Sequence, residues 1–136
     1  MEFNFENLKE KMDGQGVAGI FLFGSRAQGT ARANSDYDFA ILMRDKRILA
    51  DIKQRKIIYD ALYDILSAQV KSLRDIDIVF VQNVDLQLRY RVAKDGQLLY
   101  TGDKKIVYDF LEQTMESYAD FAPLRRIFQQ TTLARV

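Results

Sequence analysis

The chain has 136 residues, of which 48% are hydrophobic, so it suits one globular domain with a modest core and falls outside the disordered class. Its 20 basic and 19 acidic residues give a net charge of +1, which argues against a protein whose main partner is a nucleic-acid backbone. It contains neither cysteine nor histidine, which excludes disulfides, thiolate or histidine metal sites, and serine–histidine catalysis. Any bound metal must therefore have oxygen ligands, which favours Mg²⁺ or Mn²⁺.

The N-terminus does not resemble a signal peptide, because it begins Met-Glu-Phe-Asn and lacks a basic segment followed by an apolar one. No apolar run in the sequence approaches the length needed to span a membrane. We therefore expect a cytoplasmic protein without a membrane partner.

Hydrophobic periodicity predicts alternating helices and strands along the chain. The first helix contains Phe5, Leu8 and Met12 at helical spacing and ends at Gly14 and Gly16. In chain order, the remaining predicted elements are a strand at 17–23, a short helix at 25–29, a loop at 30–35, a strand at 36–43, a long helix at 47–69, a strand at 76–81, a helix at 85–94, a strand at 97–100, a helix at 106–119 and a helical stretch at 124–130.

This order predicts an α/β (α+β) fold, with a small mixed sheet and helices packed mainly on one face. No linker, internal repeat or low-complexity segment divides the chain. We therefore expect residues 1–136 to form a single domain.

Acidic residues occur in the predicted strands in a pattern that suggests metal-assisted nucleotidyl transfer. Asp36 and Asp38 lie two residues apart in one strand, so they share a face, and Tyr37 points to the other face. A third carboxylate from another strand would complete a two-metal site that activates an attacking oxygen and stabilises a leaving phosphate. Asp77 and Asp75 are both candidates for this role. We favour Asp77, because Ile76 and Ile78 flank it and a carboxylate in a buried strand needs a partner.

A Gly-Ser pair, Gly24-Ser25, closes the first predicted strand. Glycine allows a backbone to approach a phosphate closely, and a helix that begins near Ser25 would direct free N–H groups toward the anion. The Ser25 hydroxyl can add a hydrogen bond to the phosphate. Each motif alone is common in proteins. Their order and spacing together favour a catalytic site.

The sequence resembles the DNA polymerase beta-like nucleotidyltransferase superfamily in two segments, FGSRAQGTA at residues 23–31 and SDYDFA at residues 35–40. Within it, the short chain is similar to the minimal nucleotidyltransferases (MNT). The segments LRYRV at 88–92 and DGQLLY at 95–100 resemble MntA-type antitoxins, which are encoded beside HEPN-domain toxins. The resemblance covers residues 17–120 and implies the polymerase beta-like nucleotidyltransferase fold.

The resemblance also implies roles for individual residues. Gly24, Ser25 and Arg26 would bind the nucleotide, and Asp36 and Asp38 would ligate two Mg²⁺ ions. Asp77 would ligate the catalytic metal and help to activate the acceptor hydroxyl.

One position departs from the family pattern, because many relatives carry arginine where this chain has Gln28. Glutamine supplies no charge to a phosphate, so Arg26 or Arg32 would have to compensate for it.

The function implied by the resemblance is AMP transfer from ATP to a tyrosine hydroxyl of a cognate HEPN ribonuclease toxin, which would be silenced in a hetero-oligomeric complex. The chain is too short for the domains with which polymerases hold primer and template, so we expect no direct nucleic-acid contact. One alternative is a small-molecule nucleotidyltransferase of the aminoglycoside type, although those enzymes usually carry an extra helical domain. Another is an antitoxin that acts by steric binding alone.

Overall fold

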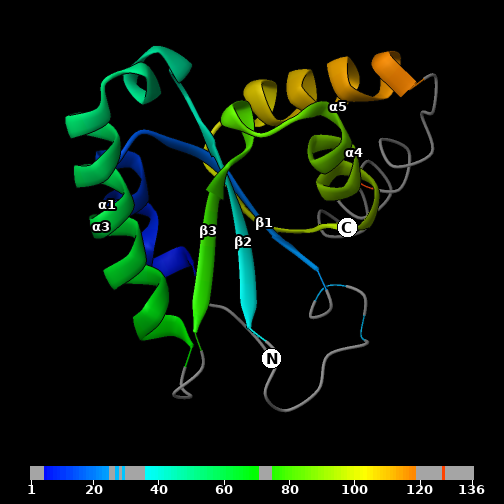
Figure 1. Cartoon of the computed structure of the whole chain (residues 1–136). Helices are drawn as coiled ribbons and strands as arrows, with labels where there is room; N and C mark the ends of the chain where they lie inside the picture. The colour runs from blue at the N-terminus through cyan, green and yellow to red at the C-terminus, as the bar shows by residue number, and fades with distance from the viewer. Residues whose placement is uncertain are drawn as a thin grey trace.

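The computed structural model describes residues 5–24, 27, 29, 36–70, 75–118 and 127. Its centre is a four-stranded sheet of order β3-β2-β1-β4 (Figure 1). The strands are β1 (Val17–Phe23), β2 (Tyr37–Met43), β3 (Ile76–Phe80) and β4 (Gln97–Thr101). β2 pairs parallel with β3, whereas β1 pairs antiparallel with both β2 and β4. The predicted mixed sheet is therefore confirmed.

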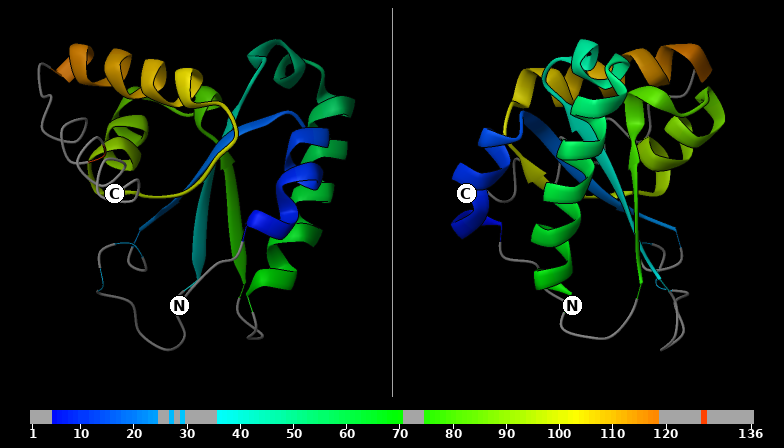
Figure 2. Two further views of the ribbon diagram at one scale, coloured as in Figure 1. Left: turned by 180° about the vertical axis from the view of Figure 1, so that it is seen from behind. Right: turned by 60° about the vertical axis from the view of Figure 1, so that its left-hand side comes forward.

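Helices cover both faces of this sheet, as the two views in Figure 2 show. On one face, α1 (Lys9–Gly14) and α3 (Ile52–Gln69) bury apolar side chains against the strands. The strand residues of this first core include Ile20, Leu22, Phe39, Ile41, Ile78 and Phe80. A parallel strand pair needs a long crossover connection, and α3 supplies the crossover between β2 and β3.

The opposite face carries α4 (Leu86–Asp95) and α5 (Lys104–Tyr118). Their buried side chains pack on strand residues that alternate with those of the first core, including Ala18, Phe21, Ala40 and Leu42. The expectation that helices pack mainly on one face is therefore wrong. The central strands β1 and β2 are buried on both sides, which explains why their sequences are almost continuously apolar.

The predicted long helix at 47–69 divides into two elements. A 3-10 helix, η2 (Lys46–Ala50), comes first, and the side chain of Asp45 accepts a hydrogen bond from the backbone N–H of Arg47 at its start. Asp51 then has an extended backbone, and its carboxylate caps α3 by accepting hydrogen bonds from two N–H groups in the first helical turn. The cap ends the first element and begins the second.

The other predicted elements agree with the structure to within two residues at most ends. A short 3-10 helix, η1 (Glu6–Leu8), precedes α1, and another, η3 (Val81–Asn83), follows β3. Asp85 caps α4, because its carboxylate accepts a hydrogen bond from the N–H of Leu88. The predicted helices at 25–29 and 124–130 lie largely outside the described residues. Among the described helices, none combines the length and apolar composition that a membrane crossing requires.

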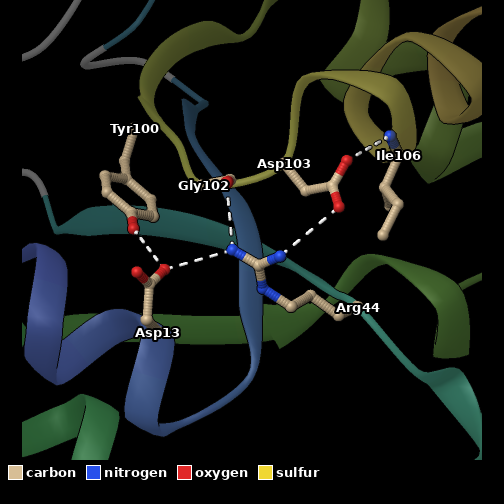
Figure 3. Close-up of polar contacts among 6 residues, drawn as sticks. All are labelled: Asp13, Arg44, Tyr100, Gly102, Asp103 and Ile106. Atoms are coloured by element: carbon tan, nitrogen blue, oxygen red, sulfur yellow. Dashed lines mark hydrogen bonds and ion pairs between the residues drawn. The ribbon is translucent and has the colours of Figure 1, made fainter.

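One polar network, the Arg44 network, ties α1, the end of β2 and the β4–α5 connection together (Figure 3). The Arg44 guanidinium donates to Asp13 at 3.1 Å, to the carbonyl oxygen of Gly102 at 2.9 Å and to Asp103 at 3.3 Å. Asp13 also accepts a hydrogen bond of 3.0 Å from the Tyr100 hydroxyl. The network lies at the end of β2 that is remote from Asp36.

Candidate functional site

Three strands bring the candidate residues to one end of the sheet. In the antiparallel pair, Asp38 of β2 lies opposite Phe23, the last residue of β1. In the parallel pair, the same Asp38 lies opposite Asp77 of β3. Because side chains in register on adjacent strands share a face and strands lie about 4.8 Å apart, Asp38 and Asp77 are direct neighbours. The site therefore forms where β1 ends and β2 and β3 begin.

The pKa of Asp38 is raised above that of an ordinary aspartate. Its carboxyl is half-buried, and burial is the main reason that its pKa is raised, followed by the negative charges of Asp77 and Asp36. Asp36, just before β2, is exposed. Tyr37 points to the opposite face as predicted, because it belongs to the first core and stacks on Phe39.

Gly24 lies against this group. Its φ of +75° is in the region that only glycine adopts easily, and a Cβ built on it would collide with Oδ2 of Asp38. The sequence had suggested that glycine was needed for a phosphate to approach. The structure adds that Gly24 makes room for the Asp38 carboxylate.

Asp75 and Asp77 differ in their relation to Asp38. Asp77 is in register with Asp38, whereas Asp75 precedes the strand and its backbone oxygen accepts a hydrogen bond of 3.1 Å from the N–H of Tyr37. Both carboxylates are exposed, so the expectation that Asp77 lies buried in its strand is wrong. The register and the charge effect on Asp38 favour Asp77 instead.

Several predicted residues lie outside the described part of the chain. These are Ser25, Arg26, Gln28 and Arg32. Their contribution to nucleotide binding stays a prediction.

The acidic side chains offer only oxygen donors, which suits a hard divalent cation such as Mg²⁺. Among the described residues, no three acidic side chains are grouped so that they could hold a metal ion, and this includes the predicted set of Asp36, Asp38 and Asp77. Asp38 nevertheless has two carboxylates near enough to raise its pKa. The donor chemistry fits an ion that would complete its shell with phosphate and water.

Sequence reasoning considered Tyr59 of α3 as a residue that could stack on a base, and favoured a packing role for it. Burial raises the pKa of its hydroxyl, and the next cause is the charge of Asp77. Tyr59 therefore lies within electrostatic reach of the candidate site, and its ring stacks on Tyr63 at 6.3 Å. Helical periodicity alone places Tyr59 beside a packing surface, and only the parallel β2–β3 crossover brings that surface near Asp77.

Comparisons with known proteins identify the family and the fold. The family of polymerase beta nucleotidyltransferases matches residues 6–105. The protein adenylyltransferase MntA of Aphanizomenon flos-aquae is 37% identical over 82 residues, which span 60% of this chain and 55% of that protein. The chain thus aligns with about half the length of this relative.

Solved structures share the fold. A chain from the crystal structure of a toxin–antitoxin with AMP-PNP superposes with a TM-score of 0.60 and 24% identity, covering 96% of this chain and 98% of the other. A chain from the complex of a tri-AMPylated Shewanella oneidensis HEPN toxin with its MNT antitoxin gives a TM-score of 0.52 and 20% identity, covering 96% and 99%. The matched region contains both segments that carried the resemblance and all three candidate carboxylates, so this chain belongs to the polymerase beta nucleotidyltransferase family.

Proposed function

We propose that this protein is a single-domain adenylyltransferase antitoxin, which transfers AMP from ATP to a tyrosine hydroxyl of a cognate HEPN toxin. The observation that carries the proposal is the in-register pair of Asp38 and Asp77, with Gly24 packed against Asp38. Two neighbouring carboxylates beside a glycine turn suit phosphoryl chemistry, because a bound divalent cation would relieve their repulsion and neutralise phosphate charge.

The relatives support the choice of donor and acceptor. One is a protein adenylyltransferase, and a structure of similar fold contains a HEPN toxin that carries AMP groups beside its MNT antitoxin. We transfer both properties to this chain as part of the proposal. The cytoplasm, which supplies ATP and Mg²⁺, would be the compartment of the reaction.

The proposed reaction forms one bond and breaks one bond. The acceptor tyrosine oxygen bonds to the α-phosphorus of ATP, and the bond from that phosphorus to the bridging oxygen breaks. Pyrophosphate leaves with the electron pair. We assign the acceptance of the hydroxyl proton to Asp77, which is exposed at the edge of the site.

The other residues bind and orient the nucleotide. Gly24 and Ser25 would hold the triphosphate beside Asp38, and Arg26 would add positive charge, because Gln28 has none. Asp36, Asp38 and Asp77 would hold Mg²⁺, which when bound neutralises phosphate charge and lowers the pKa of the attacking hydroxyl.

The direct test is the intact mass of the co-encoded HEPN protein after incubation with this protein, ATP and Mg²⁺. We expect one or more mass increments that each correspond to an AMP group, located on tyrosine by peptide mapping. Asp38→Asn should abolish the mass increments. Asp75→Ala, which removes an exposed carboxylate just before the neighbouring strand β3, should retain them.

A second outcome would favour the steric alternative. If the HEPN protein binds and is silenced while its mass never changes, adenylyl transfer is not the means of neutralisation. If a small hydroxyl compound is modified and the HEPN protein is not, the acceptor class is wrong.

A further inference from the structure

A second recess lies at the opposite end of β2 from the carboxylates. It has a volume of about 450 Å³ and opens where the end of β2 meets η2, η3, α4 and α5. Met43 at this end is five residues along the strand from Asp38, a distance of roughly 16 Å in an extended strand. We call this second recess the distal recess. It is separate from the proposed catalytic site.

Four basic and two acidic side chains line the distal recess. Two of the basic groups already have partners. Arg44 is held by the Arg44 network (Figure 3), and Arg47 pairs with Asp45 at 2.9 Å. The other acid, Asp109, pairs with Lys105 at 2.7 Å, so its negative charge is offset.

The two remaining cations, Arg89 and Lys46, form no ion pair with any residue that the structure describes. Arg89 projects from α4, and its Nε atom is buried without an acceptor among the residues that the structure describes. Lys46 likewise has no ion-pair partner within the described part of the chain. Arg89 and Lys46 both line the recess, so an anionic ligand there would offset two positive charges that no described carboxylate pairs with.

We propose that the distal recess binds a small phosphomonoester. The guanidinium of Arg89 is planar, and its terminal nitrogens can donate together to two phosphate oxygens. Lys46 supplies the second positive charge, which suits a phosphate of nearly two negative charges better than a single carboxylate.

The walls indicate an organic group on the phosphate. Leu42, Ile106 and Phe110 give the recess an apolar side, and its volume falls within the range of small-molecule sites. The Gln82 side chain does not compete for the ligand, because it is bonded to the backbone N–H and carbonyl oxygen of Met43 at 3.1 and 2.8 Å.

The test is an NMR titration of the whole chain without Mg²⁺, with AMP, inorganic phosphate and adenosine as probes. We expect AMP to shift the Arg89 Nε–H signal and the amide signals of Ile106 and Gln113 in a saturable manner. Adenosine, which lacks the phosphate, should not shift them. Tighter binding of AMP than of phosphate would show that the apolar wall contributes, and equal binding would assign recognition to the phosphate alone.

Two variants and one control complete the experiment. Arg89→Gln should weaken AMP binding at this recess roughly tenfold or more, because a charged donor pair is lost. Lys46→Gln, at an exposed position, should weaken it by a smaller factor. Arg91→Gln, on an exposed position of the same helix, is the control and should bind like the wild type. Unchanged AMP affinity in Arg89→Gln, or AMP-induced shifts confined to the end of β2 near Asp38, would overturn the proposal. The proposal does not depend on adenylyl transfer.

Discussion

Gly24 combines a backbone conformation that disfavours side chains with contact to a candidate catalytic carboxylate. We expect Gly24→Ala to reduce adenylyl transfer roughly 100-fold, because small misplacements of reacting groups have large effects on rate. The free energy of unfolding should also fall, by about 1–2 kcal/mol, because alanine is strained at this φ. Initial rates and urea denaturation measure the two effects.

Gly16→Ala provides the matched control. Gly16 also has a φ of +75°, but an added Cβ would find only ordinary contact with Met43, at the other end of β1. It should lose similar stability and retain transfer. Equal loss of transfer in both variants would show that Gly24 acts through stability and not through Asp38.

Asp77 and Asp75 can be separated by their kinetics. Asp77→Ala should abolish single-turnover transfer and retain some ATP binding through Asp36, Asp38 and Ser25, because only the register neighbour of Asp38 is removed. Asp75→Ala should transfer AMP at nearly the wild-type rate. The reverse ranking would mean that the carboxylate just before β3 faces the substrate.

At the scale of elements, the Arg44 network joins segments that are far apart in sequence. Arg44→Met should lower the free energy of unfolding by about 1–2 kcal/mol, because it removes charge-assisted hydrogen bonds that solvent partly screens. Arg47→Met, which breaks a pair on the surface, should have a much smaller effect. Equal effects in urea denaturation would show that the network does not hold the elements together.

Tyr100, which belongs to the Arg44 network, should make the stability of the protein depend on pH in the alkaline range. Burial, then the hydrogen bond to Asp13, raises the pKa of Tyr100 to about 12, from 10.0 in an unperturbed tyrosine. The contribution of the protonated Tyr100 hydroxyl to the free energy of unfolding is therefore complete below pH 10, and it is lost as the pH rises through about 12. Tyr100→Phe should remove this pH dependence. A wild type and variant with parallel stability profiles in that range would contradict the assignment.

Local sequence signals predicted most strands and helices, and the misses have physical causes. β1 and β2 were readable because both faces of each strand are buried and few polar residues interrupt them. The same signal indicated helices on two faces, which the one-face expectation overlooked. The sequence did not predict that the helix at 47–69 divides at Asp51. An aspartate within a helical pattern is equally compatible with an exposed position in the middle of a helix and with a capping position.

At the scale of the whole molecule, the candidate site depends on topology that no local pattern encodes. The spacing of Asp36 and Asp38 was sufficient to place them on one face. The sequence favoured Asp77 on an expectation of burial that was wrong, and the structural support for Asp77 over Asp75 comes from the parallel register of β2 and β3, the two strands that α3 connects. The contact between Gly24 and Asp38 likewise appears only when β1 and β2 are paired.

One variant can distinguish binding of the partner from modification of the partner. Asp36→Asn removes one exposed carboxylate and leaves the sheet and both helical layers unchanged. We expect this variant to bind the HEPN toxin, measured by co-purification, and to fail to protect cells from it. Full protection by Asp36→Asn would contradict a catalytic antitoxin.

The position of β3 has a consequence for when the site exists. Among the strands that the structure describes, β3 is the outermost and pairs with β2 alone, whereas Asp38 and Gly24 belong to the two central strands or their ends. Edge elements can open locally at a lower free energy than that of global unfolding. Detachment of β3 would carry Asp77 away from Asp38 while β1, β2 and β4 stay paired. We therefore expect catalytic competence to have its own opening equilibrium, which amide hydrogen exchange in β3 would report directly.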